Sequence, residues 1–257
     1  MTRGAAVFVL VAALLGGLTG GLVGAAVVAN LVPLPSSATT SGLFADDIAA
    51  AAAAVSPAVV TVVVSRQGVD AWGSGLVVDK EKGTIVTNSH VVEIAGATPA
   101  AGDLTILLAD GRTLGATILG SDAKTDVAVL RASGPLPAQA ELASAQATVG
   151  SRVIAIGTPG TQLATQALAN TVTVGIVSGT GRRVPRADDR NVVLSDLIQT
   201  DASIGDGMSG GPLVLVSSKQ VIGVSTSFIR GQMDLGFAVS AATVKRVLAE
   251  ILAKGTP

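Results

Sequence analysis

A succession of short β-branched runs limits what this chain can fold into more than any other feature. Gly, Asp and Pro interrupt the runs at short intervals, which is typical of an all-β sandwich or barrel. The loop at 132–150 separates six expected strands from six more, so the sequence predicts two β-barrels, at about 55–135 and about 150–240. The expected strands are Val59–Ser65, Gly73–Asp79, Thr84–Thr87, Leu104–Leu108, Thr113–Gly120, Val127–Arg131, Arg152–Ile156, Gln166–Ser178, Leu197–Thr200, Pro212–Val216, Val221–Ser227 and Gly236–Val239.

Two helices are expected beside the strands. Apolar side chains recur at helical spacing over 241–254, with charged residues on the other face, which predicts a C-terminal amphipathic helix. A shorter helix is expected to begin at Asp46 or Asp47, because the run Ala49–Ala54 has high helix propensity. Pro57 should end it.

The first 32 residues form a segment of their own. Ala5–Val32 is almost wholly apolar, and about 20 apolar residues suffice to cross the hydrocarbon core of a bilayer. Because this run exceeds the roughly 7–15-residue core of a secretory signal, we expect 1–32 to be a retained transmembrane anchor, with a cleaved signal as the alternative. The Pro/Ser-rich stretch at 33–48 is typical of a linker. Arg3 precedes the apolar run, and no other Lys or Arg occurs before Arg66, so the charge bias favours an N-terminus inside the cell. The globular domain at 49–255 is then expected outside the cytoplasm.

Composition excludes several classes of function. The net charge is −1, so the chain lacks the basic excess that nucleic-acid binding requires. It contains no cysteine, which removes a disulfide framework, a Cys-rich zinc site and a thiol nucleophile. We expect neither a metal nor another cofactor.

The strongest signal for chemistry is Gly207-Met208-Ser209-Gly210-Gly211-Pro212. A serine hydroxyl becomes a useful nucleophile only with a base beside it and backbone N–H groups aimed at the developing oxyanion. Glycines on both sides allow the backbone to turn N–H groups inward and a substrate to approach closely. Taken alone, the same string is typical of a turn between strands, so the interpretation depends on partners elsewhere.

A base for Ser209 can come from only one imidazole, because His90 is the only histidine. A lone histidine is more often structural than catalytic. His90 follows an expected strand and enters a helix-like turn, a position from which it could project between the barrels. If imidazole activates Ser209, His90 must supply it.

An acid is needed to orient that imidazole. Asp103, Asp110, Asp122 and Asp126 lie between His90 and the second barrel. The first three are typical of polar turns beside strands. Asp126 directly precedes an apolar strand, and a carboxylate at the entrance to a buried strand needs a partner. We therefore choose Asp126.

The order His90, Asp126, Ser209, with the nucleophile on the second barrel, resembles the chymotrypsin-type fold. Block by block, the region from about Val55 to Val247 is similar to the HtrA/Deg family of extracytoplasmic serine proteases. The blocks are IVTNSHVV (85–92), TDVAVL (125–130), VIAIGTPG (153–160), TVTVGIVSGTGR (171–182), LIQTDASI (197–204), SGGPLV (209–214), VIGVSTS (221–227) and LGFAVS (235–240).

The resemblance implies a role for each residue of the expected site. His90 would be the general base, Asp126 its orienting acid and Ser209 the nucleophile. The backbone N–H groups of Gly207 and Ser209 would form the oxyanion hole. Together these roles imply a trypsin-like serine protease domain over 49–255.

The resemblance also implies where a substrate would bind. The substrate would lie as an added strand along Ser225, Thr226 and Ser227. Ser203, Ser227 and Gly236 would line the primary specificity pocket. Because no acid stands at its base, the pocket should accept a small or medium apolar side chain.

Three departures from the family modify these expectations. A peptide-reading PDZ domain usually follows the protease domain, but here the sequence stops at Pro257, so we expect no such regulation. Met208 stands where the family generally has Asn, so the loop before Ser209 is expected to be mobile and the resting activity weak. The segment at 66–73 is short, which argues against cage-like oligomers, while a homotrimer through the segment near Phe44 is compatible with the resemblance.

Two classes of function remain open on the sequence. The first is a membrane-anchored or secreted serine endopeptidase that cleaves unfolded or exported polypeptides through an acyl-enzyme. The second is a protease-fold chaperone or binding module with little or no catalytic activity. A purely structural anchor would explain the apolar N-terminal segment but would leave Ser209 without a purpose.

Overall fold

The computed structural model describes residues 41–66, 69–93, 100, 102–160, 168–186, 189, 191–229 and 235–255. The chain divides into two units, Met1–Ala45 and Asp46–Pro257. The expected anchor at 1–32 and linker residues 33–40 lie outside the described residues. Within the described ranges, no helix combines the length and the apolar character needed to span a bilayer.

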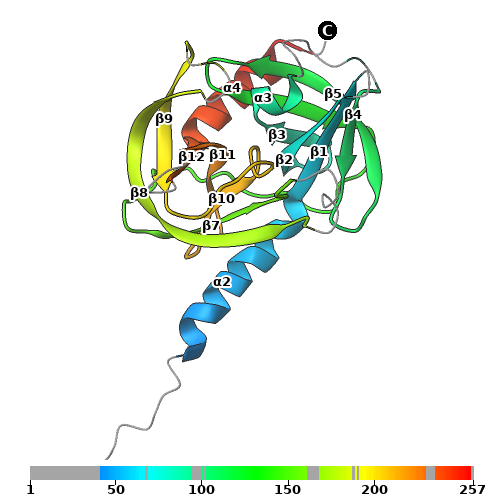
Figure 1. The fold of residues 1–257 in the computed structure, drawn as a ribbon. Helices are drawn as coiled ribbons and strands as arrows, with labels where there is room; N and C mark the ends of the chain where they lie inside the picture. The colour runs from blue at the N-terminus through cyan, green and yellow to red at the C-terminus, as the bar shows by residue number, and fades with distance from the viewer. Residues whose placement is uncertain are drawn as a thin grey trace, which may run out of the picture. The chain divides into compact units, whose positions relative to one another are not determined.

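The first barrel in the described chain is closed by six antiparallel strands in the order β1-β2-β3-β6-β5-β4 (Figure 1). Neighbouring strands of this order pair antiparallel, and β1 returns to pair with β4 to close the barrel. The strands are β1 (Val59–Arg66), β2 (Val69–Asp79), β3 (Thr84–Thr87), β4 (Leu104–Leu107), β5 (Thr113–Asp122) and β6 (Val127–Ala132).

The second barrel repeats this arrangement with the order β10-β11-β12-β9-β8-β7 over the described residues. Pairing of β10 with β7 closes it. The strands are β7 (Arg152–Gly157), β8 (Thr171–Pro185), β9 (Val193–Thr200), β10 (Pro212–Leu215), β11 (Val221–Ile229) and β12 (Leu235–Ser240).

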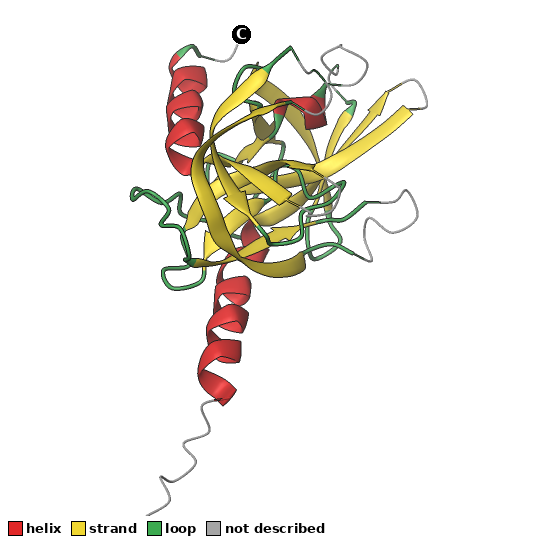
Figure 2. Ribbon diagram, turned by 60° about the vertical axis from the view of Figure 1, so that its left-hand side comes forward, coloured by secondary structure: helices red, strands yellow, loops and turns green. Residues whose placement is uncertain are grey.

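Four helical segments accompany the barrels in the described chain (Figure 2). α4 contacts β5 and β6 of one barrel and β11 and β12 of the other, so it joins the two. The Ser240 hydroxyl caps α4 by accepting the Thr243 N–H at 3.2 Å. The segments are α2 (Ser41–Val55), η1 (Ser56–Ala58), α3 (Ser89–Val92) and α4 (Ala241–Ala253).

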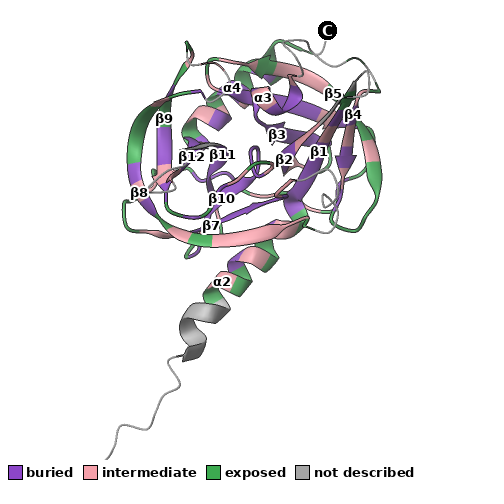
Figure 3. Cartoon of the chain, viewed as in Figure 1, coloured by how far each residue is buried: buried purple, intermediate pink, exposed green. Residues whose placement is uncertain are grey.

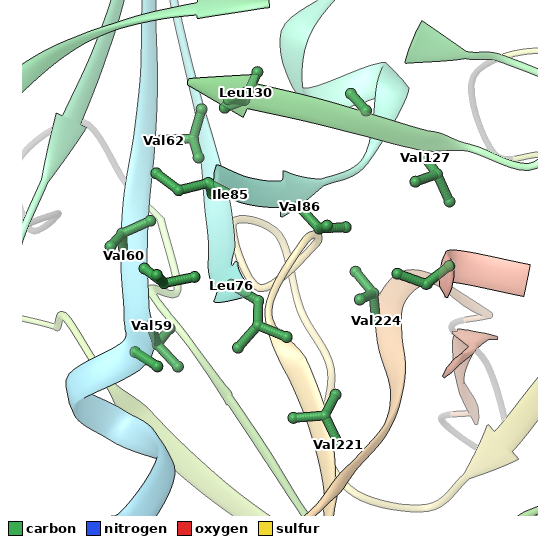
Figure 4. Packing of buried hydrophobic residues seen from close by; sticks show 14 of the residues in the cluster. Val59, Val60, Val62, Leu76, Ile85, Val86, Val127, Leu130, Val221 and Val224 are labelled. Carbon is green, nitrogen blue, oxygen red and sulfur yellow. The ribbon is translucent and has the colours of Figure 1, made fainter. Parts of the chain in front are cut away.

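The core is made of small branched side chains, because the chain is only 2% aromatic. Figure 4 shows Val62, Ile85 and Leu130 of the first barrel in one packed cluster with Val221 and Val224 of the second. Figure 3 shows the same pattern along the ribbon, with buried residues concentrated on the strands around the middle of the domain. One apolar cluster therefore includes residues of both barrels, and a second, smaller cluster lies in the second barrel.

The all-β prediction and the C-terminal helix are confirmed, but several element boundaries were wrong. α2 begins at Ser41 rather than at Asp46 or Asp47, because Leu43 and Ala45 also favour helix and nothing in the sequence stops it there. β9 begins at Val193 rather than Leu197, and β8 extends to Pro185. This far end of the β8–β9 hairpin is largely exposed, so no apolar pattern marks it as strand.

The barrels meet tightly beside the glycine-framed serine. The Ser74 N–H in β2 donates to the Ser209 C=O at 2.7 Å. Gly210, the next residue, has φ +89° and lies directly against β2. A Cβ at Gly210 would overlap the carbonyl oxygen of Ser74 and the hydroxyl of Thr87. Only glycine fits both this backbone conformation and this space.

We therefore expect Gly210→Ala to destabilise the domain by more than about 4 kcal/mol, since it combines backbone strain with a clash against main-chain atoms. Gly181→Ala is the matched control, because Gly181 also has positive φ but the space that its Cβ would enter is open to 4 Å. The control should cost only about 1–2 kcal/mol of backbone strain. Urea unfolding measures both, and equal losses would contradict the proposed close contact.

Candidate active site

Residues from both barrels converge on one cavity. Its volume is about 350 Å³, and His90 and Ser209 both line it. His90 is in α3 directly after β3, while Ser209 lies in the loop between β9 and β10. The other lining residues are Ala71, Trp72, Val91, Gly160, Asp206 and Gly207.

Asp126 contacts the imidazole of His90 on the Nδ1 side of the ring. Its Oδ2 lies 2.8 Å from Nδ1 of His90, and its Oδ1 accepts the His90 backbone N–H at 3.0 Å. An ionised carboxylate can only accept hydrogen bonds, so Nδ1 carries the proton. In the neutral ring this leaves Nε2 as the basic nitrogen.

The backbone turn that presents Asp126 is also fixed. Asp126 has φ +57°, a conformation that Asp tolerates better than most residues. The Asn88 side-chain amide donates to the Asp126 C=O at 2.8 Å, and the Ser89 hydroxyl donates to Oδ1 at 3.0 Å. The segment before His90 and the turn before β6 therefore hold each other in place.

Thr226 connects this pair to the second barrel. Its hydroxyl donates to Oδ2 of Asp126, and its backbone C=O accepts the Ser209 hydroxyl at 3.2 Å. The pairing of β11 with β12 shifts register between Ser225 and Ser227, so Thr226 sits at a β-bulge. Bulges redirect side chains, which explains how Thr226 reaches the carboxylate.

The pKa of Asp126 is lowered in the folded chain. Complete burial of the side chain acts to raise the pKa of this carboxyl. The hydrogen bond and charge of His90, followed by the hydrogen bonds from the Thr226 hydroxyl and the His90 backbone, together outweigh burial. The carboxylate is therefore ionised at neutral pH and available to stabilise an imidazolium.

The other three aspartates serve local turns. Asp103 accepts the Ala100 N–H at 2.8 Å, and Asp110 accepts the Arg112 N–H at 3.0 Å. Asp122 accepts the Lys124 N–H at 3.1 Å. Each is therefore occupied by the backbone of its own turn.

The loop before Ser209 forms a hydrogen-bonded turn in which the Met208 N–H donates to the Gly205 C=O at 3.1 Å. Gly207 occupies its third position with φ +83°, as a type II turn requires. Across the described residues, the N–H groups of Gly207 and Ser209 donate to no protein acceptor, and both residues line the cavity. These two N–H groups are therefore available to an incoming oxyanion.

Met208 itself points away from the cavity into the core of the second barrel. Its side chain is buried in a cluster with Ala155, Leu213 and Ala238. The methionine in the place of the family's asparagine therefore adds apolar packing beneath the loop.

The residues expected to bind substrate differ in their hydrogen bonds, strand pairing and exposure. Both backbone groups of Ser225 are already used, since its N–H donates to Gly211 C=O and its C=O accepts from Gly210 N–H, both at 2.8 Å. A bound chain would therefore pair from Thr226 onward rather than from Ser225. Ser227 follows in β11, opposite Phe237 of β12, and Ser203 is exposed.

One pocket residue was missed by the sequence analysis. The side chain of Ile204 is buried directly against Gly236, where a Cβ would lie 2.8 Å from the Ile204 Cδ1. The expected pocket between Ser203 and Gly236 is thus partly filled by isoleucine. An apolar residue followed by three small or polar ones gave no periodic signal that could have identified it.

Comparison with known proteins identifies the family. The family model described as "Trypsin-like peptidase domain" matches residues 73–224. The chain belongs to the trypsin-like peptidase family. The similar proteins include DegP and HtrA-type proteases, which confirms the HtrA/Deg resemblance.

Among the relatives of this trypsin-like domain, the probable periplasmic serine endoprotease DegP-like of Chlamydia trachomatis is 39% identical over 187 residues, which is 71% of this chain and 34% of that protein. Periplasmic serine endoprotease DegP of Escherichia coli is 35% identical over 190 residues, 72% of this chain and 36% of that protein. The chain thus spans about a third of these relatives. The structure of HtrA-type protease AlgW with a tripeptide has a TM-score of 0.68 and 31% identity, covering 81% of this chain and 64% of that one.

The lowered pKa of Asp126 links this site to stability in acid. Its ionised form contributes stability that is fully present above the ordinary carboxyl pKa of about 3.9 and is lost as the pH falls through the lower folded-state pKa. We expect the unfolding free energy of the wild type to fall more steeply than that of Asp126→Asn between about pH 5 and pH 2. Urea titrations at each pH measure this difference, and parallel curves would contradict it.

Proposed function

We propose that this chain is a serine endopeptidase that cleaves unfolded or exported polypeptides outside the cytoplasm. The observation that carries the proposal is the 2.8 Å contact between Asp126 and His90, with His90 and Ser209 on one cavity. The relatives of this chain include serine endoproteases named as periplasmic, which supports both the reaction class and the location.

The first half of the reaction follows from the positions of the groups. Ser209 Oγ attacks the substrate carbonyl carbon while Nε2 of His90 takes its proton, and Asp126 stabilises the imidazolium. The carbonyl oxygen becomes an oxyanion and accepts the Gly207 and Ser209 N–H groups. One such donor is worth roughly 10²–10³ in kcat.

The second half returns the site to its starting state. The tetrahedral intermediate collapses, the peptide C–N bond breaks, and His90 gives its proton to the leaving amine. An ester remains on Ser209. Water then attacks this ester while His90 takes a proton from the water. His90 finally gives this proton to the Ser209 oxygen as the acid product leaves.

In the resting site the Ser209 hydroxyl donates its hydrogen bond to the Thr226 C=O at 3.2 Å, so its proton is not directed at His90. It must leave this acceptor before its proton can pass to His90. A substrate strand along Thr226 and Ser227 would compete for the same C=O and release the hydroxyl. This supports a resting enzyme in which Ser209 is only weakly reactive, while a binding module without catalysis remains the alternative.

Two further parts of the proposal concern the other unit of the chain. Residues 1–32 would anchor the domain in the cell membrane, or would be cleaved as a signal from a secreted form. A homotrimer would form through the segment near Phe44. Neither part is needed for the chemistry at Ser209.

An active-site-directed fluorophosphonate tests the reaction class. We expect the wild type to be labelled covalently, because the probe requires a serine activated by a neighbouring base. Ser209→Ala should abolish labelling completely, and intact-mass spectrometry should place one adduct per chain.

Ser217→Ala provides the matched control, because Ser217 is an exposed serine in the turn after β10 and has no place in the proposed site. It should be labelled like the wild type. A wild type that binds unfolded protein but takes up no probe would replace the endopeptidase with the binding module.

The packing of Ile204 against Gly236 predicts a restricted specificity pocket. Replacing Ile204 with Ala should open space above Gly236 and shift cleavage from small or medium apolar residues toward larger ones such as Leu and Phe. Sequencing the products of a peptide library by mass spectrometry gives the profile.

Ile198→Ala is the control, because Ile198 is a buried isoleucine of the same apolar cluster. Its loss should cost similar stability, about 2–5 kcal/mol, without changing the profile. A wild type that cleaves mainly after Lys or Arg would overturn the pocket assignment.

A further inference from the structure

A single buried hydroxyl joins the first barrel to the loops that surround Ser209. Ser74 lies in β2 and has no exposed surface. Its Oγ donates to the Gly207 C=O at 2.8 Å and accepts the Thr158 N–H at 2.9 Å. Both partners belong to loops of the second barrel. The hydroxyl therefore uses its donor and one acceptor position on groups of the other barrel.

The carbonyls on both sides of the Gly207 Cα accept hydrogen bonds, and only the second of these bonds comes from Ser74. The Asp206 C=O accepts the Gly160 N–H at 3.0 Å, and the Gly207 C=O accepts from Ser74. Peptide units are planar, so fixing a carbonyl fixes the direction of the N–H in the same unit. The N–H of Gly207 shares its unit with the Asp206 carbonyl, and Ser74 restrains the next unit along the chain.

Gly207 needs such restraint more than any other type of residue would. Without a Cβ it can rotate between backbone conformations at little steric cost. Here it adopts φ +83°. A small rotation at this residue would turn its N–H away from the position of the oxyanion.

We propose that Ser74 is a positioning residue for the oxyanion hole, which its hydroxyl keeps in shape by anchoring the Gly207 carbonyl. This inference rests on the proposed function, because the hole has a role only if Ser209 attacks a carbonyl. Ser74 touches no reacting atom and acts through Gly207.

The two contributions of Ser74 can be separated by mutation. Its backbone N–H donates to the Ser209 C=O at 2.7 Å, and its own C=O accepts the Thr87 hydroxyl at 2.7 Å. Ser74→Ala removes only the hydroxyl and leaves these main-chain contacts. The variant therefore tests the hold on Gly207 while the nucleophile stays attached to β2.

A matched control lies in the same network. The Thr61 hydroxyl is buried and bonds the Thr158 hydroxyl at 2.7 Å, also across the two barrels. It makes no contact with Gly207. Thr61→Val keeps the side-chain shape and removes a buried inter-barrel hydrogen bond, so it reproduces a purely structural loss.

The experiment compares kcat and KM of the full chain and both variants on an unfolded protein substrate, with thermal melting as a check on folding. Removing an oxyanion donor outright costs about 10²–10³ in kcat. Ser74→Ala keeps the donor but lets its N–H turn away from the oxyanion. It should therefore lower kcat by about 10–100-fold, with KM within about twofold. Thr61→Val should leave both constants near those of the wild type.

Crystal structures of both variants test the same proposal without measuring activity. Ser74→Ala should rotate the peptide unit that contains the Gly207 carbonyl, and Thr61→Val should not. A folded Ser74→Ala chain with wild-type kcat, or with the Gly207 peptide in place, would overturn the assignment. Equal losses in both variants would do the same. A wild type that neither cleaves nor takes up fluorophosphonate would instead overturn the proposed function, and the two failures are distinct.

Discussion

The site depends on one buried carboxylate with every acceptor position filled. Asp126 is fully buried, and an ion in that position is tolerated only when hydrogen bonds replace its water. Oδ1 accepts from the Ser89 hydroxyl and the His90 backbone, and Oδ2 accepts from the His90 ring and the Thr226 hydroxyl. These donors come from α3 and from β11, so solvating one charge also joins the two barrels.

The rest of the fold supplies rigid walls for this arrangement. Small branched side chains of both barrels pack in one cluster, which allows the barrels to approach closely enough for Ser74 to contact both Ser209 and Gly207. α4 then packs across both barrels, where Ile251 lies against Gly120 of β5. The catalytic groups thus sit on short segments, each of which is tied to a barrel by hydrogen bonds.

Much of this could be predicted from the sequence, and the limits have physical causes. His90 stood out because it is the only imidazole, Ser209 because glycines at 207, 210 and 211 surround it, and Asp126 because a charge preceded an apolar strand. Thr226 was expected only as part of the strand along which a substrate would lie. Its contact with Asp126 was missed, because a one-residue register shift leaves no local pattern in the sequence. Ile204 and Ser74 were missed because their importance arises from contacts with Gly236 and Gly207, far away along the chain.

The central claim is that Asp126 holds the proton on Nδ1 of His90 and leaves Nε2 basic. Because His90 is the only histidine, ¹⁵N-histidine labelling reports on this ring alone in an NMR spectrum. At neutral pH we expect a strongly deshielded proton bonded to Nδ1 and an unprotonated Nε2, with the Nδ1 signal lost in Asp126→Ala. A neutral ring protonated at Nε2, or a freely averaging ring with no slowly exchanging proton, would contradict the account.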